Sequence, residues 1–249
     1  MPKCTRPAPM QIKGTLYLFV DFIYYSKYIM LMARIARVVA PGVPHHIVQR
    51  GNRRLDTFFS EVDYKEYLYL MADWCNRCKV QVWAYCLMPN HVHLISVTQS
   101  EDGLRKAIGE AHRRYTRYIN SRNSWKGHLW QGRFASYPMD ETYLIATARY
   151  IVMNPVRAGI VKRPEQYRWS SCKAHLQGED DILVKVRPLA EIISNWNELL
   201  IEDHSSEKYE AIRSHEKTGR PLGNDEFLER LEKQTSRLLK KQKPGPKKR

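Results

Sequence analysis

Apolar and polar positions along residues 45–155 change their period several times, and each change predicts a new element. The segment HHIVQRGN at residues 45–52 is a short apolar run that closes on a Gly-Asn pair, which is typical of a strand ending in a turn. Residues 60–79 then place apolar side chains three and four positions apart, the spacing of an amphipathic helix. Ser60 stands where such a helix favours an N-cap.

A hairpin and a second helix are predicted next. VQVWAYCLM at residues 80–88 and HVHLISVT at residues 91–98 are rich in β-branched and aromatic residues, and the Pro-Asn pair between them is a turn signal. Residues 101–119 predict a helix with one basic face and one apolar face. The apolar face consists of Leu104, Ile108, Ala111, Tyr115 and Ile119.

The pattern ends with one more strand and one more helix. LWQGRFASYPM at residues 129–139 predicts the strand, and DETYLIATARYIVMN at residues 140–154 predicts a helix that stops before Pro155, since proline disfavours helix in the residue before it. The order β-α-β-β-α-β plus a helix predicts the α+β class. It is the ferredoxin-like split βαβ arrangement, an antiparallel sheet with helices on one face.

Three regions are expected along the chain. Residues 16–32 are apolar, but Asp21 and Lys27 interrupt them, so we expect no membrane span. Met32 opens a basic run that is typical of a domain start, which makes residues 1–31 an N-terminal extension, or a start placed too early. Residues 32–177 form the main domain. Residues 178–249 predict a mainly helical C-terminal extension that ends in a basic tail.

Charge and cysteine content narrow the class of protein. Lys and Arg number 41 against 26 Asp and Glu, which gives a net charge of +15 and indicates a polyanion as partner, nucleic acid ahead of an anionic membrane surface. The 5 cysteines are irregularly spaced and do not suggest a disulfide framework. We therefore expect a reducing, cytoplasmic setting.

Two pairs of residues could carry chemistry. His91 and His93 lie two apart in a predicted strand and so project from the same face, which makes half of a divalent metal site; the alternative is two ordinary half-buried histidines. Tyr150 and Asn154 lie four apart in a predicted helix and so share a face. Asparagine offers an oxygen suited to Mg²⁺ or Mn²⁺, and tyrosine offers a phenol that can act as a nucleophile. A core position is the alternative for Tyr150, because the chain has 15 tyrosines.

Together these motifs resemble the HUH single-strand nucleases, and among them the REP-associated tyrosine transposases of bacteria. The resemblance rests on MPNHVHLI at residues 88–95 and YIVMNPVRAG at residues 150–159. Three further stretches, HHIVQRGN, LWQGRFAS and YRWSS, also resemble the family, and all these motifs occur along the chain in the family's order. It covers roughly residues 33–177 and implies that the main domain is an HUH endonuclease fold.

The resemblance also implies roles for individual residues. His91 and His93 would bind the divalent ion, Mg²⁺ or Mn²⁺. Tyr150 would attack a phosphate of single-stranded DNA, leaving a 5′-phosphotyrosine and a free 3′-hydroxyl. Asn154, as a further metal ligand, stands where related insertion-sequence transposases carry Gln. The expected partner is single-stranded or hairpin DNA, and the protein would act as a monomer or a homodimer.

Basic and aromatic residues near these motifs are candidates for DNA contact. The arginines expected to contact phosphates are Arg113, Arg114, Arg117, Arg133 and Arg157. For the first three, a solvated helix face is the alternative. Trp125 and Trp130 could stack on unpaired bases, with core packing as the alternative for Trp130.

Other functions compete with cleavage. The chain could be a non-catalytic regulator that binds repeat DNA and derives from such a transposase. Cys75 and Cys78 form a CxxC that could be half of a zinc site, but no second half completes it, so thiols within a helix are the favoured interpretation. A histidine-triad hydrolase would need a third histidine at position 95, which is Ile.

Overall fold

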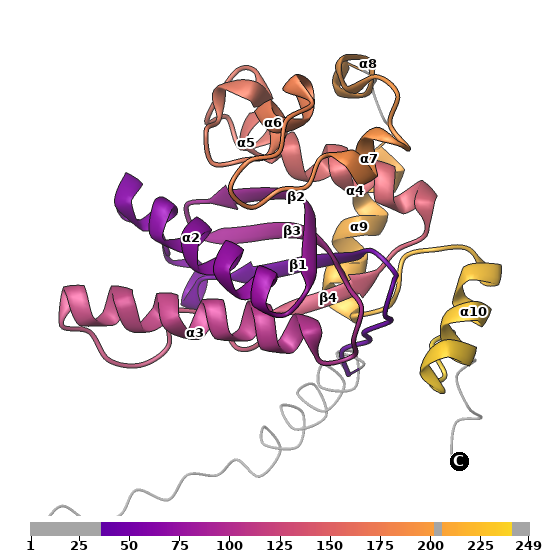
Figure 1. Ribbon diagram of the computed structural model, residues 1–249, viewed down its shortest axis with the longest axis horizontal. Coiled ribbons are helices and arrows are strands. Elements are labelled where there is room, and N and C mark those ends of the chain that lie inside the picture. The colour runs from indigo at the N-terminus through magenta and orange to yellow at the C-terminus, as the bar shows by residue number, and fades with distance from the viewer. Residues whose placement is uncertain (1–35, 202–205, 241–249) are drawn as a thin grey trace, which may run out of the picture. The chain divides into compact units, whose positions relative to one another are not determined.

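The computed structural model describes residues 36–201 and 206–240. Apart from the short η1 (Asn52–Arg54) after β1, its first seven helices and strands follow the predicted order and form an α+β domain (Figure 1). These elements are β1 (His45–Arg50), α2 (Glu61–Arg77), β2 (Val80–Met88), β3 (His91–Thr98), α3 (Gly103–Asn123), β4 (Ala135–Pro138) and α4 (Glu141–Val152). The predicted β-α-β-β-α-β order and fold class are confirmed.

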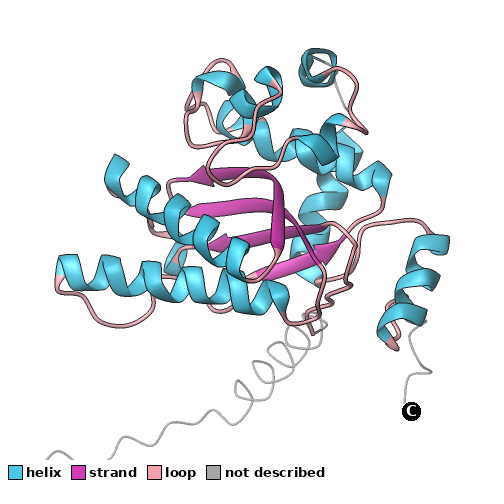
Figure 2. Cartoon of the chain, in the orientation of Figure 1, coloured by secondary structure: helices cyan, strands magenta, loops and turns pink. Residues whose placement is uncertain are grey.

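The four strands form one sheet in the order β2-β3-β1-β4 (Figure 2). Each neighbouring pair is antiparallel, so β3 lies between β1 and β2, as a split βαβ unit requires. In the central pair, Val48 lies opposite His93 and Arg50 lies opposite His91. This register decides which side chains share a face with the two histidines.

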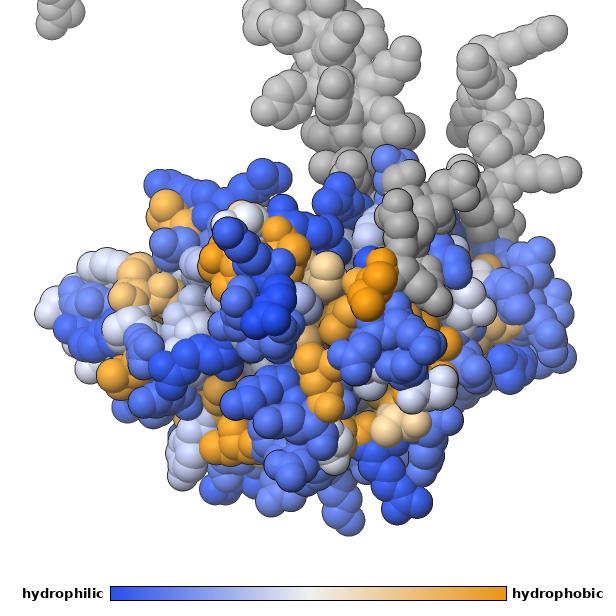
Figure 3. Space-filling model, turned by 90° about the horizontal axis from the view of Figure 1, so that it is seen from above, coloured by the Kyte–Doolittle hydropathy of each residue, from blue (hydrophilic) through white to orange (hydrophobic). Residues whose placement is uncertain are grey.

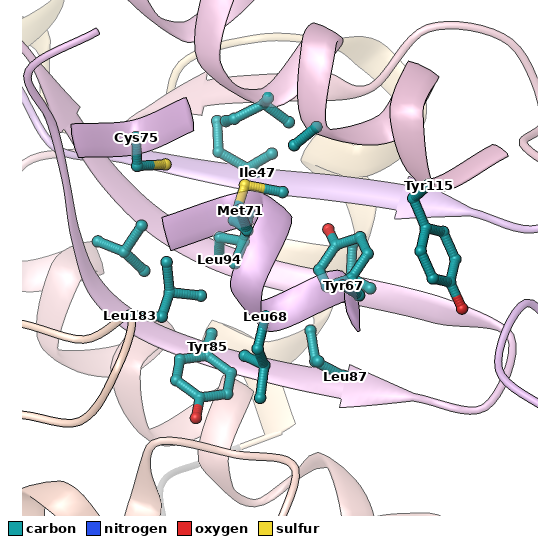
Figure 4. Close-up of a cluster of buried hydrophobic side chains, with 14 of the residues drawn as sticks. Ile47, Tyr67, Leu68, Met71, Cys75, Tyr85, Leu87, Leu94, Tyr115 and Leu183 are labelled. Carbon is teal, nitrogen blue, oxygen red and sulfur yellow. The ribbon is translucent and has the colours of Figure 1, made fainter. Parts of the chain in front are cut away.

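Two hydrophobic clusters cover the two faces of the sheet. On one face, α2 and α3 pack over Ile47, Leu87 and Leu94, and Figure 4 shows the aromatic and sulfur-containing side chains that fill this cluster. On the other face, α4 packs over Val48 and Ile95. The five apolar residues predicted to face inward from residues 101–119 are all buried. Periodicity alone was sufficient there because the face of a helix is a local property.

The segment between α3 and α4 differs from its prediction. The strand occupies only four residues of the eleven predicted, because Gly132 adopts a left-handed backbone with φ 75° and Trp130 makes only an isolated bridge to Gly51. Helix α4 ends at Val152, two residues before the predicted end. Asn154 and Pro155 instead begin a separate short helix, α5 (Asn154–Arg157), where proline is tolerated in the first turn.

The remainder of the chain is mainly helical, as predicted. Its elements are η2 (Pro164–Gln166), α6 (Cys172–Gln177), α7 (Arg187–Ala190), α8 (Trp196–Ile201), α9 (Ser206–Thr218) and α10 (Asp225–Thr235), and η1 (Asn52–Arg54) follows β1. The predicted extension at residues 1–31 and the end of the basic tail at 241–249 lie outside the described residues. The division at residues 177 and 178 stays a prediction.

The face of the described part that Figure 3 shows is mostly hydrophilic, with apolar patches between the polar side chains. No helix among the described residues is long and apolar enough to cross a membrane.

A buried carboxylate joins the start of α2 to the end of α3. The fully buried Asp63 accepts hydrogen bonds from the backbone N–H groups of Phe59 and Ser60, at 2.8 and 2.9 Å, and forms an ion pair with Arg122. Burial raises the pKa of the Asp63 carboxyl, but the hydrogen bonds from Arg122 and the Phe59 N–H outweigh it, so the pKa lies below its usual value. The ionised form is therefore the stabilising one.

Replacing Asp63 with asparagine is expected to lower the free energy of unfolding by about 1–3 kcal/mol at neutral pH. Because the folded-state pKa of Asp63 is lowered, its contribution is present above about pH 4, the pKa of an unfolded Asp, and is lost as the pH falls further. Urea unfolding at pH 7 and near pH 3 measures both effects. The matched control, Asp73→Asn in an exposed pair with Arg77, is expected to change stability by less than about 0.5 kcal/mol. Equal effects of the two variants at pH 7 would contradict this role of Asp63.

Candidate active site

Strand pairing brings three histidines onto one face of the sheet. His91 and His93 project from β3 toward the α4 side, and His46 projects from β1 toward the same side, two residues from Val48. The His91 and His93 ring centroids are 5.0 Å apart, and those of His46 and His93 are 5.2 Å apart. The sequence motif is therefore extended by a histidine from a neighbouring strand.

Hydrogen bonds leave one nitrogen of each predicted ligand available. His93 Nδ1 lies 2.9 Å from His46 Nε2, and His91 Nδ1 lies 2.6 Å from the side-chain oxygen of Asn90. An amide oxygen only accepts, so His91 Nδ1 carries the hydrogen and its Nε2 carries the lone pair that could bind an ion. In the same way, His93 Nδ1 is hydrogen-bonded to His46, and His93 Nε2 remains available to bind an ion. Fixing one ring nitrogen so that the other binds an ion is the usual arrangement of metal-binding histidines.

Burial keeps these imidazoles neutral, which is the state that binds a metal. It lowers the pKa of His91 to about 3, with Arg50 and Arg157 adding to the effect. It also lowers the pKa of His93 well below its usual value, and His91 and His46 contribute further. The arrangement fits a divalent ion held by two nitrogens.

Oxygen donors lie within reach of the histidines from two directions. The Asn154 side chain, at the start of α5, lies 3.5 Å from His91 Nε2 through its nitrogen, so its amide is beside the predicted ligand even though α4 ends before it. The Glu216 carboxylate, from α9, forms with His46 and His93 a group whose ligand atoms all lie within 4.8 Å of one another. Either oxygen could complete the set, and the sequence indicated only the first.

Tyr150, in α4, lies beside the histidines. Its ring centroid is 5.7 Å from that of His93, and the two rings meet edge to face. The Arg157 guanidinium lies over the Tyr150 ring at 3.9 Å, and the Arg213 side chain hydrogen-bonds to Tyr150. Burial and Glu216 raise the pKa of Tyr150, while Arg157 and Arg213 act in the opposite direction. A phenol and two cations thus meet at the histidine site.

Helix α9 supplies residues to the site that no sequence motif indicates. Tyr209 packs against Tyr150 with ring centroids 5.6 Å apart, while Arg213 and Glu216 reach the site from the same helix. Tyr150 is only 6% exposed as a result of this packing and that of the sheet. No local motif marks these residues, because their place depends on how a distant helix packs. His46 was within a quoted motif, but its partner strand could not be known from sequence.

The five predicted DNA-binding arginines do not gather in one place. Arg157 is at the site, and its Nη1 is buried without a hydrogen-bond partner among the described residues. The others lie elsewhere: Arg113, Arg114 and Arg117 belong to α3, on the opposite face of the sheet from the histidines. Arg113 binds Glu110 at 2.6 Å, and Arg133 shares a surface hollow with Arg113 and Arg37. DNA contact by these arginines stays a prediction.

Cys75 and Cys78 lie in or beside the hydrophobic cluster between α2 and the sheet. Cys75 is buried in the α2–α3 cluster, and Cys78 is half-buried at the end of α2. Among the described residues, neither belongs to a group of three side chains that could hold a metal ion. The favoured interpretation, thiols within a helix, agrees with this placement.

Comparison with known proteins supports the class that this fold and site define, a transposase domain. Residues 41–154 match the family described as "Transposase IS200 like". This segment is therefore similar to the IS200-like transposases, and the resemblance found in the motifs is confirmed. No curated protein matches the sequence.

Two solved structures are similar to the chain. A REP-associated tyrosine transposase bound to a REP hairpin has a TM-score of 0.52 and 19% identity, over 62% of this chain and 93% of that one. This likeness shows that the fold is shared. A protein of Deinococcus radiodurans R1 described as a candidate transposase has a TM-score of 0.35 and 19% identity, over 47% of this chain and 95% of that one. A likeness at that TM-score supports no conclusion.

Proposed function

We propose that this protein cleaves and rejoins single-stranded DNA at hairpin-forming repeats, as a bacterial cytoplasmic enzyme with Tyr150 as its nucleophile. One observation carries the proposal: the Tyr150 ring lies beside His93, with the Arg157 guanidinium over it and Arg213 as a hydrogen-bond partner. Two comparisons support DNA as the substrate. Residues 41–154 match the IS200-like transposase family, and the protein shares its fold with a transposase bound to a REP hairpin.

The proposed reaction is a transfer of the DNA phosphate to tyrosine. The Tyr150 oxygen loses its proton and forms a bond to phosphorus, while the bond from phosphorus to the 3′-oxygen breaks and that oxygen gains a proton. The free 3′-hydroxyl can then attack the phosphotyrosine and reverse the step, so strands are rejoined without a separate energy source. Transfer to a different 3′-hydroxyl joins new strands.

The chain's own residues serve this reaction in two ways. Arg157 and Arg213 would stabilise the negative charge that Tyr150 develops, and Arg157, whose Nη1 has no hydrogen-bond partner among the described residues, would donate to a phosphate oxygen. His91 and His93 would hold Mg²⁺ or Mn²⁺, with Asn154 or Glu216 as the oxygen donor. A divalent ion bound there supplies positive charge to polarise the phosphate and stabilise the leaving oxygen.

A labelled hairpin with a single-stranded flank tests the proposal. With Mg²⁺ or Mn²⁺ present, label at the 3′ end should move with the protein on a denaturing gel, because tyrosine is joined to the 5′-phosphate of the downstream fragment. Label at the 5′ end should appear in a shorter, protein-free strand. An adduct that carries the 5′ label would contradict the proposed polarity.

Binding of repeat DNA without cleavage is the second candidate function. It is favoured by the burial of Tyr150, which is 6% exposed and packed against Tyr209. A regulator would bind the hairpin but form no covalent adduct with the DNA, whether Mg²⁺ or Mn²⁺ is present. The labelled hairpin therefore distinguishes the two functions in one experiment.

Arg157→Met is expected to slow adduct formation about 10- to 100-fold at saturating DNA, because it removes a cation from the reacting phosphate. Methionine keeps the apolar stem against Tyr150, so the affinity for the hairpin should change much less. The matched control is Arg163→Met, since Arg163 is exposed and pairs with Glu165 away from the site. Equal rates in the two variants would show that Arg157 does not act on the phosphate.

A further inference from the structure

Two aromatic side chains stand exposed and in contact on the surface. Phe59, just before α2, and Trp125, just after α3, meet edge to face with ring centroids 5.4 Å apart. Their side chains are 46% and 50% exposed. Single exposed apolar residues are common, but a pair of large exposed rings in contact more often marks a binding surface. We call Phe59 and Trp125 the aromatic pair.

The protein holds the aromatic pair in place through buried contacts. The Phe59 N–H donates to Asp63, and Asp63 is bound by Arg122 near the end of α3. On the other side, the left-handed Ser124 turns the chain so that the Trp125 N–H donates to the Asn120 carbonyl at 2.9 Å. The Asp63–Arg122 pair thus fixes the two helix ends that carry the rings. A rigid aromatic surface loses little entropy when it binds a ligand.

The loop that carries Phe59 is anchored next to the proposed metal site. The N–H groups of Thr57 and Phe58 both donate to the Pro89 carbonyl. The Asn90 side chain donates to the Arg54 carbonyl at 3.1 Å, and its oxygen accepts from His91 Nδ1. One asparagine therefore links this loop directly to a predicted metal ligand. Gly51 allows the tight start of the loop, because a Cβ there would collide with the Leu55 carbonyl.

Basic residues occur in the loop that leads to Phe59 and beside Trp125. Arg53 and Arg54 are exposed and adopt left-handed backbone angles, φ 54° and 63°, which are uncommon for residues other than glycine. Beside Trp125, a surface hollow is lined by Arg117 and Lys126. Exposed aromatic rings flanked by cations are the combination with which proteins bind unpaired nucleotides, since bases stack on rings and phosphates pair with cations.

We propose that the aromatic pair stacks on unpaired bases of the single strand that flanks the hairpin, and that Arg53 and Arg54 hold the phosphates of the same strand. This inference rests on the proposed function, because it assumes a single-stranded substrate that continues from the metal site. Because Asn90 links this loop to His91, a strand bound along the loop would lead toward the position where cleavage would occur. The aromatic pair would thereby help to set which phosphate reaches Tyr150.

Affinity measurements on two DNAs test the inference. One is a hairpin with a single-stranded flank of about ten nucleotides, within the range that a single-strand binding surface covers, and the other is the same hairpin with a blunt end. The double variant with Phe59→Ala and Trp125→Ala is expected to bind the flanked hairpin about 10- to 100-fold more weakly. Its affinity for the blunt hairpin should stay within about twofold, because stacking on the flank contributes nothing there.

The salt dependence separates stacking from charge. The double aromatic variant should keep the wild-type slope of affinity against salt, whereas Arg53→Ala with Arg54→Ala should reduce the slope. Tyr69→Ala is the matched control, since Tyr69 is an exposed aromatic residue of α2 outside the aromatic pair, and it should change neither quantity. Trp125→Phe keeps a ring and should keep most of the affinity, which guards against misfolding as the cause.

An equal loss on both DNAs, or no loss on either, would overturn the inference. The proposed function is judged separately, by adduct formation at saturating flanked hairpin. Flank-dependent binding through the aromatic pair without any wild-type adduct would refute cleavage and leave the stacking surface intact. An adduct without flank-dependent binding would refute the stacking surface and leave the proposed cleavage intact.

Discussion

Tyr150→Phe is expected to abolish the covalent protein–DNA adduct and to reduce strand cleavage by at least about 10³-fold. The substitution removes only the phenol oxygen, which is the atom that would bond to phosphorus. The phenyl ring can still pack under Arg157 and against Tyr209, so the fold and hairpin binding should persist. Adduct yield on a denaturing gel and hairpin affinity, measured on the same protein, separate the two effects.

Tyr209→Phe is the matched control for this experiment. Tyr209 packs against Tyr150 and under the same arginine, Arg157, at 5.1 Å, so it also brings a phenol to the site. We expect this variant to form the adduct at close to the wild-type rate. The opposite pattern, an adduct in Tyr150→Phe and none in Tyr209→Phe, would assign the nucleophile to α9.

Alanine at His91 or at His93 is expected to slow cleavage about 10²- to 10³-fold, the scale of losing one electrostatic contact to the reacting phosphate. Each substitution removes one of two nitrogens that would hold the ion. The affinity for Mn²⁺, measured by calorimetry or magnetic resonance, should fall by more than about 100-fold, since even outer partners of metal ligands contribute about 10- to 100-fold. Chelation of the ion should stop adduct formation in the wild type, and added Mn²⁺ should restore it.

His128→Ala is the control for the metal experiment, because His128 is exposed in the loop between α3 and β4 and belongs to neither of the strands that carry the three histidines. It should leave Mn²⁺ affinity and cleavage unchanged. If His91→Ala bound Mn²⁺ as tightly as His128→Ala does, the histidine pair would not be the metal site.

Local signals determined most of what could be predicted. The helix face of residues 101–119 and the strands on either side of Pro89 follow from periods and turn residues that act over a few positions. The same reasoning placed His91 and His93 on one face, because side chains alternate along a strand. The end of the helix that carries Tyr150 was less predictable, since Pro155 started a new helix instead of only ending the old one.

Long-range contacts account for what sequence alone did not reveal. His46 reaches His93 only because β1 pairs with β3 in one particular register, which no local pattern specifies. Arg213 and Glu216 reach the site because α9 packs on the α4 side of the sheet, some sixty residues after Tyr150. Phe59 meets Trp125 because a buried ion pair joins two helix ends. Each of these contacts is set by tertiary packing.

Mass mapping of the adduct is the most direct test of Tyr150 as the nucleophile. The trapped complex would be digested with a protease and a nuclease, and the peptide that carries a nucleotide would be sequenced by mass spectrometry. The predicted result is a nucleotide joined through its 5′-phosphate to Tyr150 in the peptide that contains YIVMN. A nucleotide on any other residue, or on Tyr150 through a 3′-phosphate, would contradict the proposed mechanism.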